Sequence, residues 1–465
     1  MLLRPLQCGA PPPHRCEGGR SRSGAAIGPG ADGPFVYKEE YQQMALPLYW
    51  SEGGGCMSRT DDSASPDDPR RLRRDHHLIQ SANLGFSVAQ AMAAVAVPIL
   101  AVYAGHPIEL IGIIVAVSAV SQTVARLGMG TLMSRLPTKH FIAAATLLLS
   151  ASCFLLGFST ELWAFIIAQL LQGAARAYFW TGSQTHVVRA SESAVTALSR
   201  LNVVQGVGQL IGPALAGFIG AWSLQMSLLA AGALAAIALA PAIALVRFAP
   251  FPQRSRHGTG RPRQIWRQPG VGMAASMAAV AGAWRGILNS YLPVILTAAG
   301  HSIPVAGALM TVANLASLCG SAFSRRIHAA GPRVANAIGT AGAGLGLVLA
   351  SFFPNPIWVV AVGLTISGLG AGILQTVGPA LAVDSISEED RGRAIASIGT
   401  FRSISLFVSP LATAGLILIV PSAAIAAGIA GIIISTPTLS TLIRRRGQAR
   451  TSQEGTHDHD EDFAN

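Results

Sequence analysis

The chain has 465 residues, of which 51% are hydrophobic and 12% are charged, and its formal net charge is +11. This composition is too apolar for a soluble protein of that length and indicates a polytopic membrane protein. The arginines are dispersed through short loops between apolar runs, so the charge indicates membrane orientation and no nucleic-acid partner. The five cysteines have neither disulfide nor metal spacing, and neither a metal nor a cofactor is expected.

The first 75 residues are rich in Gly, Pro, Ser and charge and have no sustained periodicity. We therefore expect a disordered cytoplasmic tail over residues 1–75. Met57 opens a more ordinary start, because a short polar tail follows it and leads into the first apolar run. Our hypothesis is that residues 1–56 are not native or are dispensable.

From His77 onward, the chain alternates between apolar runs and short polar loops. Each run is near the ~20 residues that a helix needs to cross a bilayer. The predicted spans are 78–103, 108–130, 141–159, 162–186, 195–220, 223–246, 270–297, 304–324, 333–353, 356–383, 394–418 and 421–442. The predicted fold is therefore an all-α membrane protein with about twelve transmembrane helices.

A basic connector over residues 247–269 separates the two apolar halves and holds six arginines and no acidic residue. Loops on its side of the membrane also carry arginine, whereas alternate loops such as 105–109 carry none. This asymmetry places the connector and both termini in the cytoplasm, in the plasma or inner membrane. The predicted domains are 76–246, with six spans, and 270–443, with six more, followed by a cytoplasmic tail over 444–465.

The two halves share short sequence features at similar positions, which indicates an internal repeat. The loops after the second and eighth spans both read Gly-x-x-x-Ser-Arg. The matched positions are Gly130 to Arg135 with Gly320 to Arg325, Gly173 with Gly370, and Pro213 with Pro410.

Three motifs resemble those of the major facilitator superfamily (MFS) over residues 78–443. The segment GTLMSRLPTK, from Gly130, is similar to the family's loop between its second and third helices, with Ser134 and Pro137 replacing an acidic residue and a glycine. The segment GQLIGPALAG, from Gly208, is similar to a pattern associated with exporters. Gln172-Gly173 and DSISEEDRGRA, over 384–394, resemble the family's fourth helix and the loop after its tenth. The resemblance implies two six-helix bundles.

These motifs predict roles in gating and helix packing. The small residues of the fifth span lie nearly in line, which lets another helix approach closely, and its proline bends the span. Helix packing alone is an equally good interpretation of them. The predicted gating and packing residues are Gly130, Arg135, Gly208, Gly212, Pro213, Gly217, Gly320, Arg325, Asp384 and Arg391.

Polar residues inside the predicted spans mark a pathway for solute, because they are costly in a bilayer. In the fourth span they recur at steps of three or four and so share one helical face. The resemblance implies that the first, fourth, seventh and tenth helices line the central cavity. The predicted substrate-binding residues are Asn83, Gln90, Gln172, Arg176, Trp180, Arg285, Asn289 and Gln375.

Arg176 and Arg285 lie near the middle of their spans, one in each half, and no Asp or Glu lies in the middle third of any span. A mid-membrane arginine costs ~2.5–3.5 kcal/mol even on the lenient insertion scale. Our hypothesis is that the two form an anion-attracting site for a carboxylate or phosphate. Alternatively, Arg176 bonds to backbone carbonyls and Arg285 lies nearer the interface. For Arg126 and Arg402 we expect side chains that extend to the membrane surface.

The sequence therefore predicts a monomeric secondary transporter of a small organic solute, leaning to export and to an anionic or amphipathic substrate. The alternatives are a proton-coupled multidrug exporter of lipophilic cations and a facilitator or anion exchanger for uptake of an organic acid. Coupling protons or ions would need titratable groups, for which His186 and Asp384 are the nearby candidates. An enzyme would need clustered His, Asp or Glu. Ser134 and Pro137 also permit a sensor without transport activity.

Overall fold

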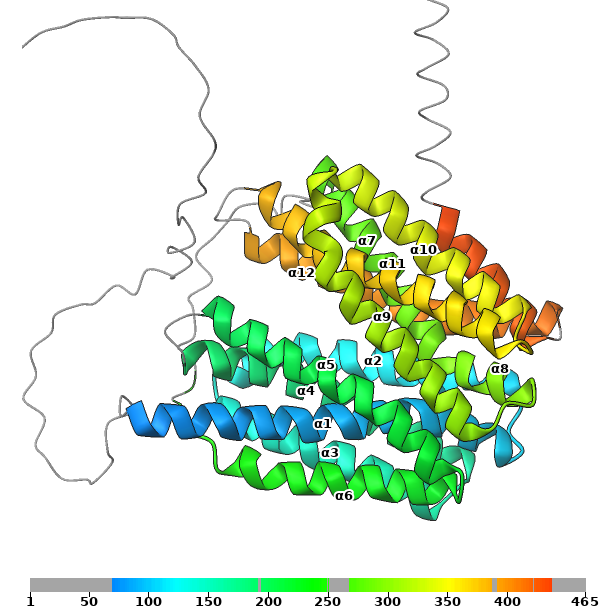
Figure 1. Ribbon diagram of the computed structural model, residues 1–465. Coiled ribbons are helices and arrows are strands. Elements are labelled where there is room, and N and C mark those ends of the chain that lie inside the picture. Colours follow the sequence, from blue (N-terminus) through cyan, green and yellow to red (C-terminus); the bar gives the residue numbers. More distant parts are fainter. Residues whose placement is uncertain are drawn as a thin grey trace, which may run out of the picture. The chain divides into compact units, whose positions relative to one another are not determined.

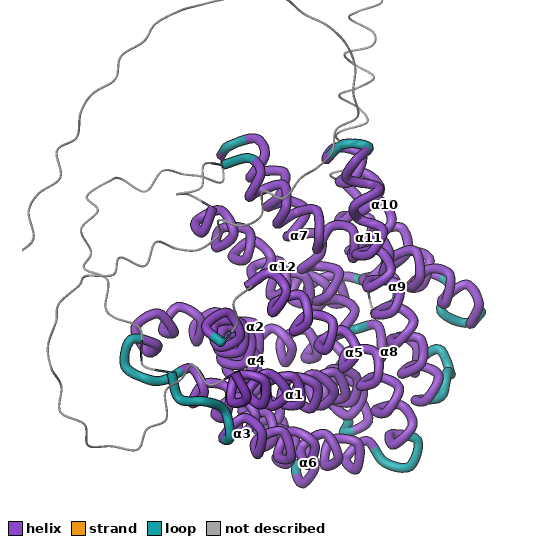
Figure 2. The backbone as a smooth tube through the Cα atoms, turned by 60° about the vertical axis from the view of Figure 1, so that its left-hand side comes forward, coloured by secondary structure: helices purple, strands orange, loops and turns teal. Residues whose placement is uncertain are grey.

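The computed structural model of the protein describes residues 69–190, 194–248, 250, 267–386, 391–420 and 422–436. Within these ranges the chain forms helices and loops only (Figure 2). The helices are α1 (Pro69–Tyr103), α2 (Ile108–Met133), α3 (Thr138–Phe158), α4 (Leu162–Arg189), α5 (Ala194–Gly220), α6 (Leu224–Ile243), α7 (Pro269–Ser290), α8 (Leu292–Ala298), α9 (Ile303–Ala329), α10 (Pro332–Phe352), α11 (Ile357–Asp384), α12 (Arg391–Ile419) and a final helix, Ala423–Thr436.

The described helices are long and apolar enough to confirm the predicted all-α membrane class. Ten of them, with α7 and α8 taken together, have the length and hydropathy of a membrane span. Two further helices, α4 and Ala423–Thr436, are compatible with a total of twelve crossings. The polar face of α4 lowers its hydropathy, and the described part of the final helix is short.

Helices α1 to α6 pack mainly on one another, as do α7 to α12, so the described chain forms two helix groups (Figure 1). We call them the first and second bundles. The bundles contact each other mainly where α5 packs on α9 and where α2 packs on α12. We call the end at which α6 leads into residue 247 the connector end, and the end at which α1 leads into α2 the opposite end.

The first helix begins earlier than the sequence predicted. Residues 69–75 were expected in the disordered tail, but α1 begins at Pro69 and includes them. Proline suits the first helical turn because it has no N–H to leave unpaired there. Asp75 is then buried among other elements, which holds this first part of α1 in place. Residues 1–68, most of the connector and the tail over 444–465 lie outside the described residues.

The seventh predicted span is interrupted, which the sequence analysis did not foresee. Helix α7 ends at Ser290 and α8 begins at Leu292. Pro293 has no N–H to donate to the carbonyl of Asn289, so the helix breaks there. Tyr291, at the break, is fully buried and its hydroxyl accepts a hydrogen bond from the backbone N–H of Gly112, 3.0 Å away, on α2.

The internal repeat is visible in helix packing, with one correction to the predicted register. Gly173 of α4 packs against the carbonyl of Ser118 on α2, and Gly372 of α11 packs in the same way against the carbonyl of Ser317 on α9. Gly372 follows Gly173 by the same number of residues as Ser317 follows Ser118. The predicted partner of Gly173 was Gly370, which instead packs against α10.

Candidate functional site

A polar cavity lies between the two bundles, near the middle of their helices. Its volume is about 20 Å³, which is room for about one water molecule. The first bundle contributes Ala93, Ala94, Val97, Pro98, Val115, Ser118, Ala119, Gln169, Gln172 and Arg176, and the second contributes Gly286, Asn289 and Leu406. Because the lining comes from α1, α2, α4, α7 and α12, movement of one bundle against the other would change the shape of this cavity.

Arg176 supplies the positive charge of the cavity wall. It lies near the middle of α4, and its Nη1 donates to Ser118 Oγ on α2 at 3.2 Å. The approach of the two helices depends on Gly173, because a side chain there would meet the backbone of Ser118. Arg176 Nε is buried without a hydrogen-bond partner, and so is Nε2 of Gln172, one turn away and 1% exposed.

Arg285 lies in the second bundle and does not line this cavity. Its Nη1 donates to Asn314 Oδ1 on α9 at 2.8 Å, and its guanidinium lies 5.0 Å from the ring centroid of Trp284. Its charged neighbour is Arg402 of α12, which lies within electrostatic range. We expected Arg285 to form one site with Arg176; the charged side chain within electrostatic range of Arg285 is that of Arg402.

Arg402 differs from what we expected of it. It was expected to extend to the membrane surface, but its Nη2 donates to Gln375 Oε1 on α11 at 3.2 Å. It also lies within electrostatic range of Arg126 on α2, so it faces the other bundle. Arg126 and Arg402 are both exposed. The two arginines therefore lie where α2 and α12 are not in close contact.

The remaining predicted substrate-binding residues divide between the cavity and helix packing. Asn289 lines the cavity. Gln90 lies one turn of α1 away from it, with Oε1 buried and without a partner. Asn83 is fully buried, and its Nδ2 donates to the carbonyl of Leu201 at 2.7 Å, so it joins α1 to α5 rather than facing the cavity. Trp180 packs edge-on against Phe86.

The predicted packing glycines of α5 lie at close helix contacts. Gly208 and Gly212 pack against α1, at Ser87 and Ala91. Gly217 packs against α9, where the backbone carbonyl of Pro213 approaches Gly307. The fifth span thus contacts both bundles through its small residues.

Gly320 of α9 packs against the backbone of Leu369 on α11. Arg135 and Asp384 are exposed at the connector end, where α2 and α11 finish. The surroundings of Gly130 and the side chains of Arg325 and Arg391 lie outside what the structure describes.

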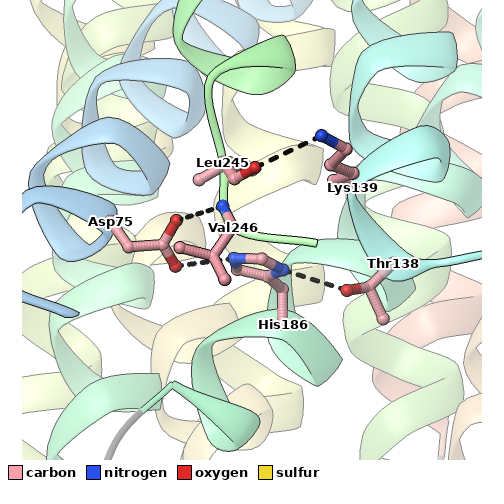
Figure 3. A network of polar contacts seen from close by, with 6 residues as sticks. All are labelled: Asp75, Thr138, Lys139, His186, Leu245 and Val246. Carbon is pink, nitrogen blue, oxygen red and sulfur yellow. Dashed lines mark hydrogen bonds and ion pairs between the residues drawn. The ribbon is translucent and has the colours of Figure 1, made fainter. Parts of the chain in front are cut away.

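Sequence reasoning missed a buried polar network at the connector end of the first bundle (Figure 3). Asp75 accepts from the backbone N–H of Val246 at 2.7 Å, and its other oxygen lies 2.8 Å from His186 Nε2. His186 Nδ1 lies 2.9 Å from Thr138 Oγ1. Because a carboxylate only accepts, Nε2 of His186 carries a hydrogen. The network therefore joins α1, α3, α4 and the residues that follow α6.

The bundles are in closer contact at the opposite end than at the connector end. At the opposite end, Gly112 of α2 packs against Pro410 and Ala414 of α12 and bonds to Tyr291. Toward the connector end the same two helices carry the exposed arginines 126 and 402. Helices α2 and α12 are therefore packed more closely at the opposite end than at the connector end.

Fold and site together define a class: a multi-pass helical membrane protein with a cationic, polar cavity between two helix bundles. The family model described as Major Facilitator Superfamily matches residues 81–410, so the chain belongs to this superfamily of transporters. No curated protein sequence matches the chain. Family membership indicates a secondary transporter of a small molecule rather than an enzyme.

Several solved transporter structures have a similar fold. A mutant of the nucleoside transporter NupG has a TM-score of 0.66 and 12% identity, covering 79% of this chain and 99% of that chain. A POT family transporter in complex with 5-aminolevulinic acid has a TM-score of 0.63 and 11% identity, covering 81% and 96%. A bacterial homologue of the human lysosomal transporter Spinster, in an inward-facing and unoccupied conformation, has a TM-score of 0.61 and 14% identity, covering 81% and 95%. At these identities the likeness concerns the fold alone.

Proposed function

We propose that this protein is a secondary transporter that moves an organic anion across the cell membrane by alternating access. The observation that carries the proposal is Arg176, at mid-helix in the wall of a cavity between the bundles. Its guanidinium bonds to a neutral hydroxyl and keeps an unpaired Nε. An arginine at mid-membrane depth costs ~2.5–3.5 kcal/mol on the lenient insertion scale, so it calls for a counter-charge.

The described residues hold no carboxylate that would neutralise this charge. Their acidic residues are Asp75, Glu109, Glu161 and Asp384, which lie at or near helix ends. Asp75 already pairs with His186. A cargo that brings its own negative charge therefore supplies the missing partner, and the fork of an arginine suits a carboxylate or a phosphate.

The same charge distribution disfavours the export of lipophilic cations. A cation in this cavity would meet the positive field of Arg176, with Arg285 and Arg402 near by and no acidic group among the described lining residues. Proton coupling would need a titrating group in the pathway, and His186 instead lies buried at the connector end. We therefore favour exchange of one anion for another as the driving reaction.

The proposed orientation follows from charge. Arginine is concentrated at the connector end, which the positive-inside rule assigns to the cytoplasm, together with both termini. With this orientation the connector end, where the bundles are less closely packed, faces the cytoplasm, in the plasma or inner membrane. The looser packing at this end and the small-residue pattern of α5 both support efflux as the direction of transport.

The experiment is a thermal-stability screen of the purified protein in detergent against organic anions and organic cations matched in size. A ligand that binds the folded state raises apparent stability by mass action. We expect anions to raise the melting temperature of the wild type and of the control Arg333→Gln, whose arginine is exposed at the start of α10. We expect Arg176→Gln to lose most of this effect.

If anions stabilise the protein, the next measurement is transport in proteoliposomes preloaded with the stabilising anion. External anion should drive exit of the preloaded anion in the wild type and much less in Arg176→Gln. Stabilisation by lipophilic cations in the wild type and in Arg176→Gln alike would refute the anion proposal. It would make Arg176 a structural residue and favour multidrug export.

A further inference from the structure

We infer that the transported anion carries two separate acidic groups, one bound by each bundle. The inference rests on the proposed function, since it names the substrate class of the same site. It comes from a second cationic cluster, Arg285 and Arg402 with Gln375 and Asn314, which the sequence did not indicate as a unit. The four residues come from α7, α12, α11 and α9.

The second cluster has the composition of an anion site. Arg285 and Arg402 lie within electrostatic range of each other, and each is bonded through one guanidinium nitrogen to a neutral amide oxygen. No carboxylate among the described residues pairs with either arginine. Two cations held together with only neutral partners repel each other, and a bound anion between them would remove that repulsion.

One unpaired donor in the cluster and one beside it also favour a bound anion. Nε2 of Gln375 is buried without a hydrogen-bond partner, and so is Nε1 of Trp284, whose ring lies beneath the Arg285 guanidinium. Trp284 is fully buried. Both atoms can only donate, so a ligand that satisfies them must accept. A carboxylate accepts at both oxygens and carries the charge that the two arginines lack, so it meets both requirements.

Along α7 and α12, the second cluster lies about one helical turn from residues that line the cavity. The cavity that contains Arg176 is lined by Asn289 and Leu406. Arg285 and Arg402 each come four residues earlier on the same two helices, which places them about 6 Å nearer the connector end. One acidic group at Arg176 and a second at the arginine pair would therefore be joined by a short spacer.

The internal repeat of the two bundles explains why a charge of the second cationic cluster comes from α12 and not from α11. The packing that relates Gly173 to Gly372 also relates Arg176 to Gln375, since each lies three residues further along its helix. Where the first bundle has a cation, the second has an amide. That amide accepts a hydrogen bond from Arg402, which brings a cation to the second bundle from a different helix.

The test compares dicarboxylates with monocarboxylates of the same chain length: succinate with butanoate, glutarate with pentanoate and adipate with hexanoate. Melting temperature against concentration is measured for the wild type, Arg176→Gln, Arg402→Gln, Arg402→Lys and the control Arg333→Gln. In the wild type we expect a dicarboxylate to raise the melting temperature at a concentration about tenfold lower than the matching monocarboxylate does. This difference is the effect of one further charge-assisted contact.

The variants separate this inference from the proposed function. Arg402→Gln should lose the preference for the dicarboxylate and keep the response to the monocarboxylate, while Arg402→Lys, which retains the charge, should keep part of the preference. Equal responses to both classes in the wild type would overturn the two-group inference and leave the anion proposal standing. A stronger response to a phosphate monoester than to any dicarboxylate would also overturn it, because both charges then lie on one group. The absence of any response to anions would overturn the proposed function itself.

Discussion

Replacing Asp75 tests whether the buried network of Figure 3 stabilises the first bundle. The carboxylate is 1% exposed and serves two donors, the Val246 N–H and the His186 Nε2–H. Asp75→Ala would leave both donors buried without a partner, at about 1–3 kcal/mol each. We therefore expect it to lower the free energy of unfolding by about 2–6 kcal/mol, a range that includes the ~3–5 kcal/mol typical of a broken buried ion pair.

Asp75→Asn separates the loss of charge from the loss of hydrogen bonds. The amide oxygen can still accept from the Val246 N–H, and the amide nitrogen can donate to His186 if the imidazole moves its hydrogen to Nδ1. His186 Nδ1 would then donate to Thr138 Oγ1, 2.9 Å away. Every member keeps a partner, so we expect a loss of only about 1 kcal/mol.

The assay is denaturant unfolding of the purified protein in mixed micelles, followed by intrinsic fluorescence. Asp384→Asn is the control, since Asp384 is exposed at the end of α11. The expected order of stability is wild type and Asp384→Asn, then Asp75→Asn, then Asp75→Ala by a wide margin. Equal stability of the Ala and Asn variants at position 75 would refute the hydrogen-bond reasoning.

Two further predictions concern helix packing. Gly173→Ala would place a methyl group against the Ser118 carbonyl and should destabilise the protein by about 1–3 kcal/mol in the same unfolding assay; Gly128→Ala, with nothing within 4 Å, should instead gain up to about 1 kcal/mol from helix propensity. Tyr291→Phe removes the acceptor of the Gly112 N–H, worth about 0.5–1.5 kcal/mol, and should shift the population severalfold toward opening at the opposite end. Distances between spin labels on the two opposite-end loops would measure that shift, and an unchanged distribution would contradict it.

The fold class could be predicted from the sequence because apolar length and loop charge act locally, and the family was indicated by the resemblance of short contiguous motifs. A run of about 20 apolar residues needs no knowledge of its neighbours to be recognised. The break at Tyr291 depends on one proline and on a hydrogen bond to a residue in another bundle, which no local pattern contains. The start of α1 was missed for a similar reason: Asp75 follows a run of arginines, and only its distant partners make it a buried residue.

The candidate site was predictable as a set of polar residues but not as a set of contacts. Helical spacing placed Gln172 and Arg176 on one face of α4, and the cavity is lined by both. The same spacing could not show that Asn83 turns toward α5 or that Arg402 turns toward Gln375. An arginine side chain reaches several ångströms along a helix in either direction, so its sequence position does not decide between membrane surface and protein interior.

The position of the arginines also suggests how the cargo would change the conformation. Arg126 in the first bundle and Arg402 in the second lie within electrostatic range of each other toward the connector end, where both side chains are exposed. Like charges there oppose closure of the bundles at the connector end, whereas the opposite end is held by uncharged contacts such as Tyr291 with Gly112. An anion bound beside Arg402 would weaken that repulsion. The empty protein would then remain open at the connector end, and the loaded protein would close there more readily, as exchange of one anion for another requires.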